Sequence, residues 1–127
     1  MYKELIIIVI VIAIIVGLDI ITNRYTKQTL EILSSELNIL KDYILKEDKE
    51  NSKEQMQKIK LKWEERYKIL AFYIEHDELE KVETEMVKLE ADIEVEEFKH
   101  CISEFETTNF ILEHIQEKEE MHLRSIF

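Results

Sequence analysis

The sequence predicts an all-α protein in which one N-terminal transmembrane helix is followed by a small antiparallel bundle of about four helices. Three observations predict this class. The chain has one glycine and no proline, the residues on which tight turns and hairpins depend. It is rich in Leu, Ile, Glu and Lys, which favour helices. Residues 5–18 form an unbroken apolar run, and later hydrophobic residues recur at helical spacing.

The apolar run is long enough to cross a membrane. Residues 5–18 read LIIIVIVIAIIVGL, and Ile20 and Ile21 extend the run past Asp19. A helix over residues 5–21 is about 25 Å long, close to the thickness of a bilayer's hydrocarbon core, about 30 Å. A cleaved signal peptide is the main alternative, but no Ala-x-Ala cleavage site follows the run. We therefore expect residues 5–21 to bind the membrane as an uncleaved anchor.

Charge divides the chain into an anchor with its flanks, residues 1–27, and an acidic helical bundle, residues 28–127. The formal net charge is −11, and the three basic residues before residue 28 outnumber the two acidic ones. The excess negative charge therefore lies in the bundle, where it disfavours nucleic acid and anionic lipid as partners. Basic residues flank the anchor almost equally, so the positive-inside rule gives little guidance. We expect a single-pass protein of the cell membrane, with the bundle outside.

Four hydrophobic stripes follow the anchor. The first runs from Leu30 to Ile44 in alternating steps of three and four residues, like the a/d seam of a coiled coil. No strong breaker separates this seam from the anchor. The stripes of the next three helices are Met56, Ile59, Trp63, Tyr67, Leu70 and Ile74; Leu79, Val82, Met86, Leu89 and Ile93; and Phe98, Ile102, Phe105, Leu112 and Ile115.

Two short patterns predict where helices begin. Ser52 with Gln55 matches a capping box, in which each side chain bonds a free backbone N–H at the helix start. Asp77 with Glu80 is a looser version of the same pattern. We expect the second and third bundle helices to begin at these residues.

No signature of catalysis is present. One glycine rules out a glycine-rich phosphate loop or a dinucleotide fingerprint, and no Ser or Cys lies in the glycine-flanked turn of a nucleophile elbow. The single Cys101 forms no internal disulfide. Carboxylate pairs arise by chance in helices this rich in Glu. We expect a non-enzymatic protein with no catalytic residues and no cofactor.

The histidines are the residues best suited to chemistry. His76 precedes Glu80 by four residues and His114 precedes Glu117 by three, so each pair shares a helix face. Packed side by side, the four side chains could bind Zn²⁺, although no Cys-x-x-Cys or His-Glu-x-x-His spacing supports this. The alternative is structural: each imidazole hydrogen-bonds at a helix end, or responds to pH near neutrality. We favour the structural role.

Aromatic residues crowd one segment of the sequence. Trp63 has core spacing, and its alternative role is that of an exposed anchor for a partner. Phe72 and Tyr73 are adjacent and cannot both face one core. We expect one of them on an exposed patch, a feature that often marks a partner surface.

Two segments, residues 63–83 and 112–127, resemble the domain-of-unknown-function family 4363. The resemblance implies a small protein of low-GC Gram-positive bacteria, with one N-terminal membrane helix followed by further helices and no assigned activity. Gln116 stands where members often have proline. Gene neighbourhoods typical of the family suggest an integral membrane protein as partner. The residues that match the family pattern are Trp63, His76, Glu78, His114, Glu117 and Glu119.

The function we expect is that of a non-enzymatic, membrane-tethered interaction or structural module in a membrane or envelope complex. One alternative is a metal- or pH-sensing module that uses His76 and His114. Another is a self-associating coiled-coil scaffold, a homo-oligomer joined through the Leu30–Ile44 seam. The candidate interaction or structural residues are Trp63, Phe72, Tyr73, His76, Glu78, His114, Glu117 and Glu119.

Overall fold

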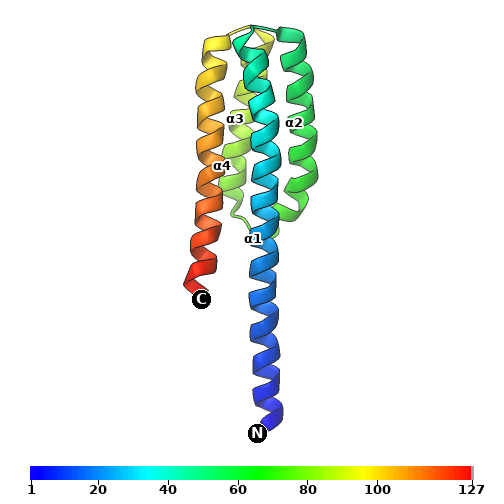
Figure 1. Cartoon of the computed structure of the whole chain (residues 1–127), viewed down its shortest axis with the longest axis vertical. Helices are drawn as coiled ribbons and strands as arrows, with labels where there is room; N and C mark the ends of the chain where they lie inside the picture. Colours follow the sequence, from blue (N-terminus) through cyan, green and yellow to red (C-terminus); the bar gives the residue numbers. More distant parts are fainter. Residues whose placement is uncertain (127) are drawn as a thin grey trace.

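A computed structural model describes residues 1–126 as four α-helices joined by short loops (Figure 1). The helices are α1 (Tyr2–Leu45), α2 (Lys49–Leu70), α3 (His76–Glu94) and α4 (Phe98–Ile126). No strand occurs among these residues. The predicted fold class, a long apolar N-terminal helix leading into an antiparallel helical bundle, is confirmed. The apolar segment and the first bundle helix are one continuous helix.

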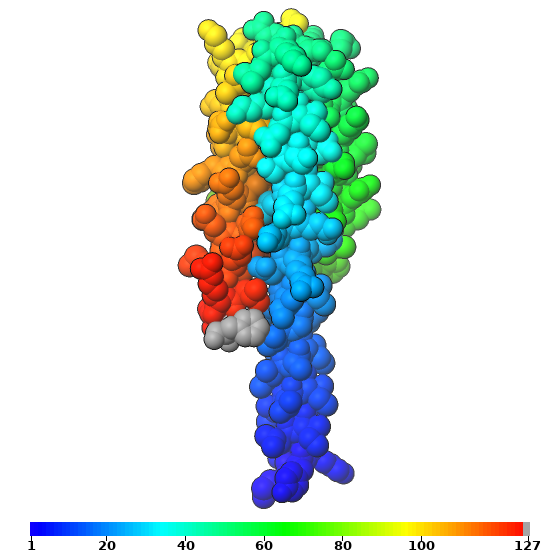
Figure 2. Space-filling model, in the orientation of Figure 1, coloured from blue at the N-terminus to red at the C-terminus, as the bar shows by residue number. Residues whose placement is uncertain are grey.

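Helix α1 has two halves with opposite surroundings. It is 44 residues long, about 66 Å at the α-helical rise, and its N-terminal half protrudes alone from the bundle (Figures 1 and 2). Most side chains of residues 5–21, the apolar segment, are exposed, whereas Leu33, Leu37 and Leu40 are fully buried. Among the described residues, α1 alone is long and apolar enough to cross a membrane.

The four helices close into a ring around one core. Helix α1 contacts α2 and α4, and α3 contacts the same two helices from the opposite side. The α1–α2 and α3–α4 loops lie at the end far from the apolar segment, and the α2–α3 loop lies at the near end (Figure 1). We call this near end the base of the bundle. The core includes the predicted seam Leu30–Ile44, together with Met56, Ile59, Trp63, Leu70, Ile74, Leu79, Val82, Met86, Leu89 and Ile93.

The two loops at the far end have the same backbone form. Glu47 and Glu96 adopt positive φ angles of 54° and 60°, a conformation that glycine usually provides. The N–H groups of Asp48 and Glu97 donate to carbonyl groups five residues back, at 3.0 and 2.9 Å. These bonds are those of a Schellman motif, which closes a helix C-terminus locally. Both turns therefore form without glycine or proline.

The predicted start of α2 is wrong. The helix begins at Lys49, and the Asp48 side chain caps it by accepting a hydrogen bond from the Asn51 N–H at 3.2 Å. Ser52 is buried inside the helix. Gln55 instead donates to the Glu36 backbone oxygen at 2.9 Å and so links α2 to α1. The helix therefore begins before Ser52, because the Asp48 carboxylate caps it in place of the predicted Ser52 hydroxyl.

The predicted caps of α3 and the predicted stripe of α4 also need correction. Helix α3 begins at His76, one residue before Asp77, and has no side-chain cap. In α4, Phe98 and Ile102 are only half-buried, while Cys101 and Thr108 are fully buried beside the predicted Phe105. Thr108 fits this apolar position because its hydroxyl donates to the Glu104 backbone oxygen at 2.7 Å.

We expect Trp63→Ala to destabilise the full-length protein by about 3–5 kcal/mol, the usual cost of emptying a large aromatic site in a core. Trp63 is 4% exposed, and its indole N–H donates to Glu83 Oε1 at 3.2 Å. Denaturant unfolding in detergent micelles, followed by circular dichroism, measures the change. Phe72→Ala is the control, because Phe72 is 88% exposed and should change stability by less than about 0.5 kcal/mol. Equal stability of the two variants would contradict the core assignment.

Candidate functional site at the base of the bundle

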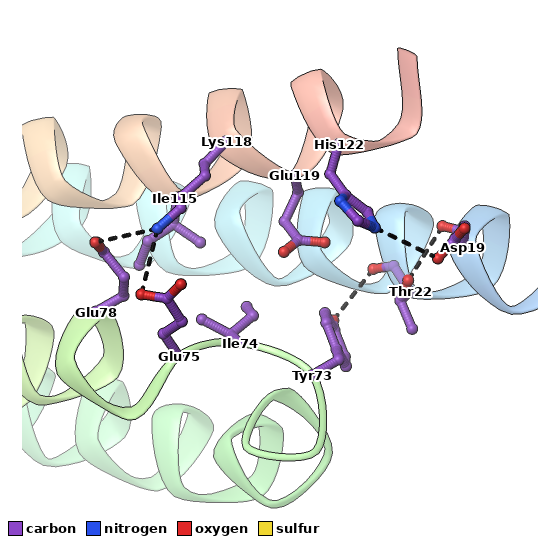
Figure 3. Close-up of a pocket in the computed structure, with 10 residues that line it drawn as sticks. All are labelled: Asp19, Thr22, Tyr73, Ile74, Glu75, Glu78, Ile115, Lys118, Glu119 and His122. Atoms are coloured by element: carbon purple, nitrogen blue, oxygen red, sulfur yellow. Dashed lines mark hydrogen bonds and ion pairs between the residues drawn. The ribbon is translucent and has the colours of Figure 1, made fainter. Parts of the chain in front are cut away.

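The base of the bundle contains a cavity of 310 Å³. Its walls come from α1, the α2–α3 loop, α3 and α4, so the cavity exists only when the ring of helices is closed (Figure 3). It lies where the apolar segment meets the bundle. The lining residues are Asp19, Thr22, Tyr73, Ile74, Glu75, Glu78, Ile115, Lys118, Glu119 and His122.

Tyr73 holds the α2–α3 loop against α1. Its hydroxyl donates to the Thr22 backbone oxygen at 3.1 Å and is 2.7 Å from the hydroxyl of Thr26. Thr26 is 1% exposed, so this contact is shielded from water. Burial raises the pKa of Tyr73, partly offset by the Thr26 hydrogen bond. The bundle's contacts with α1 thus begin before residue 28, and the predicted domain limit falls inside a packed helix.

Arg66 joins the last turns of α2 to the same stretch of α1. Its guanidinium lies 3.8 Å from the centre of the Tyr25 ring, a favourable cation–π distance. Its Nε donates to the Thr29 hydroxyl at 2.8 Å, and another guanidinium nitrogen donates to the Tyr25 backbone oxygen at 3.2 Å. Together with Tyr73, Arg66 fixes the base of the bundle to α1 beside the apolar segment.

Acidic side chains dominate the cavity. Glu78 is 8% exposed, and its Oε1 lies 3.8 Å from the Lys118 ammonium, which also pairs with Glu75 at 3.4 Å (Figure 3). The other oxygen of Glu78 and one oxygen of Asp19 are buried without a hydrogen-bond partner among the described residues. Carboxylates accept hydrogen bonds and donate none when ionised. The cavity therefore suits a group that is cationic or that donates hydrogen bonds.

Glu119 adds to the acidic character of the cavity. Burial raises its pKa, and the negative charge of Asp19 raises it further, whereas His122 and Lys118 lower it. His122 Nε2 lies 4.0 Å from Asp19 Oδ1 across the gap between α4 and α1 (Figure 3). These residues bring the C-terminal part of α4 to the end of the apolar segment.

The predicted aromatic residues separate as expected. Tyr73 points into the cavity region and bonds α1, whereas Phe72 is 88% exposed. Trp63 lies in the core, so its alternative role as an exposed partner anchor is wrong. Of the other candidate interaction residues, Glu78 and Glu119 line the cavity.

The two histidines singled out from the sequence stay apart from the cavity. His76 is the first residue of α3, and its side chain is 76% exposed, with Nε2 3.9 Å from Glu80 Oε2 and so beyond hydrogen-bond distance. His114 lies in the middle of α4 and is exposed, so its predicted place at a helix end is wrong. Its neighbours Leu112 and Ile115 face the core. Within residues 1–126 no three His, Cys, Asp or Glu side chains form a metal-binding group, so His76, Glu80, His114 and Glu117 do not assemble as one.

Several residues of this site were not predicted from the sequence. Asp19 carried a visible signal, because it interrupts an apolar run. Lys118, His122 and Arg66 carried none, since each lies in a charged stretch of an acidic chain. Their roles come from the closure of the ring.

Comparison with protein families identifies the domain. Residues 20–126 match the model of a domain of unknown function, DUF4363. The chain belongs to the DUF4363 family. The DUF4363 match includes every cavity residue except Asp19, and it begins just before the apolar segment ends. No curated protein and no solved structure matches the chain.

A second group of titratable residues lies between α3 and α4. Burial and, after it, the neighbouring Asp92 together raise the pKa of Glu104 to about 7. One oxygen of Glu104 is buried without a hydrogen-bond partner among the described residues. The adjacent Cys101 is fully buried, and burial raises its pKa to about 12. Its thiol is therefore protonated and unreactive at neutral pH.

We expect Glu104 to make the protein less stable as the pH rises. A carboxyl whose pKa is higher in the folded chain than in the unfolded chain binds its proton more tightly when folded. Stability is therefore lost between the ordinary glutamate pKa of 4.5 and the folded pKa of about 7, and is not regained above it. Glu104→Gln should be more stable than the parent at alkaline pH, because it removes a partly buried charge. We expect a gain of about 1 kcal/mol, since solvent screening weakens the effect at this partly exposed pair.

Denaturant unfolding at acidic and alkaline pH measures this difference. Glu113→Gln, at an exposed position of the same helix, should keep the parent's pH dependence. An equal pH dependence in Glu104→Gln and the parent would show that Glu104 ionises freely in the folded protein.

Proposed function

We propose that this protein is a non-enzymatic, membrane-tethered interaction or structural module of a membrane or envelope complex, with an integral membrane protein as its partner. One observation carries the proposal: α1 runs without a break from the exposed apolar segment into the core of the bundle. The same helix thus connects a lipid-compatible surface to a folded acidic domain.

The exposed apolar segment supports the tether. Its surface aliphatic side chains are between 37% and 64% exposed, and the N-terminal part of the segment protrudes from the bundle on the face that Figure 2 shows. Apolar surface in water costs roughly 25 cal/mol per Å², so a segment of this kind needs lipid or an apolar partner. The hydrocarbon core of a bilayer surrounds such a helix and buries the apolar side chains on all of its faces.

The coupling between segment and bundle supports an interaction role. The only glycine of the chain is Gly17, and there is no proline, so residues 18–45 contain no helix-breaking residue. The α1 seam from Leu30 to Ile44 is buried within the chain's own bundle and is not exposed to form a coiled coil with a second copy. The base of the bundle, with its acidic cavity, then faces the membrane at a fixed height. A membrane protein beside the anchor can reach this cavity.

We expect the full-length protein to stay in membranes after carbonate washing, with the bundle outside the cell. Lipid burial of the uncharged run, residues 5–18, does not depend on charge, so high pH should not release it. Ser35→Cys, at an exposed position of α1, should react with a membrane-impermeant maleimide in intact cells. The parent should not react, because Cys101 is fully buried.

Two variants control this test. Ile8→Asp combined with Ile12→Asp should release the protein, because each charge costs about 3 kcal/mol at the centre of a membrane helix. Leu61→Asp, which alters an exposed residue of the bundle, should leave membrane retention unchanged. Carbonate release of the parent would contradict the tether, and labelling of Ser35→Cys only after cell lysis would place the bundle in the cytoplasm.

We expect a partner to contact the rim of the cavity. A photo-crosslinking amino acid in place of Glu75, whose side chain is 71% exposed at the rim, should give a discrete adduct with one membrane protein. The same amino acid in place of Lys58, exposed on α2, is the matched control. Glu78→Gln should lower the adduct yield, since it removes a charge from the cavity. Equal adducts at both positions, or none at either, would contradict a partner site at the base.

A further inference from the structure

We propose that the base of the bundle lies within the lipid headgroup layer, with Phe72 of the α2–α3 loop and Met121 of α4 as its apolar contacts. The bilayer is the partner of these apolar side chains, whereas the membrane protein of the proposed function contacts the cavity rim at Glu75. This inference rests on the membrane tether of the proposed function, and extends it from the apolar segment to residues of the folded domain.

The height of the loop is fixed by its bonds to α1. Tyr73, next to Phe72, bonds the Thr22 backbone oxygen and the Thr26 hydroxyl. Thr22 directly follows Ile21, the last residue of the apolar segment. At the α-helical rise, Thr26 is about 7.5 Å beyond Ile21, and the headgroup region of one leaflet is roughly 5–7 Å thick. The loop therefore lies at headgroup depth when the apolar segment spans the hydrocarbon core.

Helix α4 reaches still deeper. His122 Nε2 lies 4.0 Å from Asp19 Oδ1, and Asp19 stands inside the apolar segment, before Ile20 and Ile21. Because α4 is antiparallel to α1, its next residues continue along the apolar segment, beyond the ends of α2 and α3 (Figure 1). The last turns of α4 therefore reach the boundary between headgroups and hydrocarbon.

The side chains at the base suit this position. Phe72 is 88% exposed, Met121 67% and Ile69 48%. Apolar side chains are also exposed elsewhere, for example Phe110 at 69%, so exposure alone does not identify a membrane contact. Position along the helix distinguishes the two sites. Phe110 precedes His122 by twelve residues of helix, about 18 Å, and so lies well above the headgroups.

Several exposed side chains at the base carry positive charge. Arg24, Lys68 and Arg124 are exposed there, and the last two lie in the final turns of their helices. Their long side chains can reach lipid phosphates. Asp19 is only 21% exposed and, with Glu119, turns into the cavity (Figure 3). These basic groups are thus available to lipid phosphates and these two acids are withdrawn from them, whereas Glu75 remains 71% exposed at the cavity rim.

Depth-dependent quenching tests the inference on the full-length chain. Phe72→Cys and, as the matched control, Phe110→Cys are labelled with an environment-sensitive fluorophore. The native Cys101 stays unlabelled because it is fully buried. Both proteins are reconstituted into vesicles of phosphatidylcholine and phosphatidylglycerol that contain a headgroup spin-labelled lipid. We expect quenching at position 72 to exceed quenching at position 110 by at least about twofold, given their different depths.

Each outcome has a distinct meaning. Equal quenching at the two positions, in protein that floats with the vesicles, overturns the inference and leaves the tether intact. A label at position 72 that is shielded from aqueous quenchers yet not quenched by the lipid shows that another protein chain covers the base, and also overturns it. Failure of the parent protein to float with vesicles contradicts the tether of the proposed function itself.

Discussion

The structure depends on the continuity of α1, because this one helix contains both the exposed apolar segment and a seam that is buried in the bundle core. Residues 5–18 are apolar on all faces, whereas from Thr26 onward only one face is buried. Backbone hydrogen bonding continues through the transition, since no proline interrupts it and the only glycine precedes it. The position of the bundle relative to the apolar segment is therefore a property of the helix itself. In the proposed membrane setting, a contact at the base of the bundle has a defined height above the bilayer.

The two ends of the bundle are closed by different means. At the far end, Glu47 and Glu96 form local turns whose hydrogen bonds stay within a few residues. At the base, the α2–α3 loop depends on tertiary contacts, because Tyr73 and Arg66 bind α1 side chains and carbonyl groups far away in sequence. The end that carries the candidate site is thus the end whose structure requires the whole ring. Disturbing α1 near Thr26 should affect the loop, the cavity and any partner together.

Burial concentrates unusual carboxyl groups at two places in an otherwise solvated acidic protein. Between α3 and α4, Glu104 shares a partly buried site with Asp92, and its pKa is raised to about 7 by burial and by this neighbour. At the base, Glu78 and Asp19 each keep a buried oxygen without a partner among the described residues. A buried acceptor without a partner costs about 1–3 kcal/mol, a cost that a bound donor could offset. Of the two places, the cavity is therefore the better suited to recognition.

Local periodicity was enough to predict the helices, the apolar segment and most of the core from the sequence. Leu33, Trp63 and Leu89 are buried where their spacing predicts. Helix starts were predicted less well, since Asp48 displaced the Ser52 cap. The candidate site emerged only from the packing of the helices: Asp19, Tyr73 and His122 come from three distant segments that meet when α4 closes on α1. Periodicity defines which face of a helix is buried, but not which residues of other helices lie opposite it.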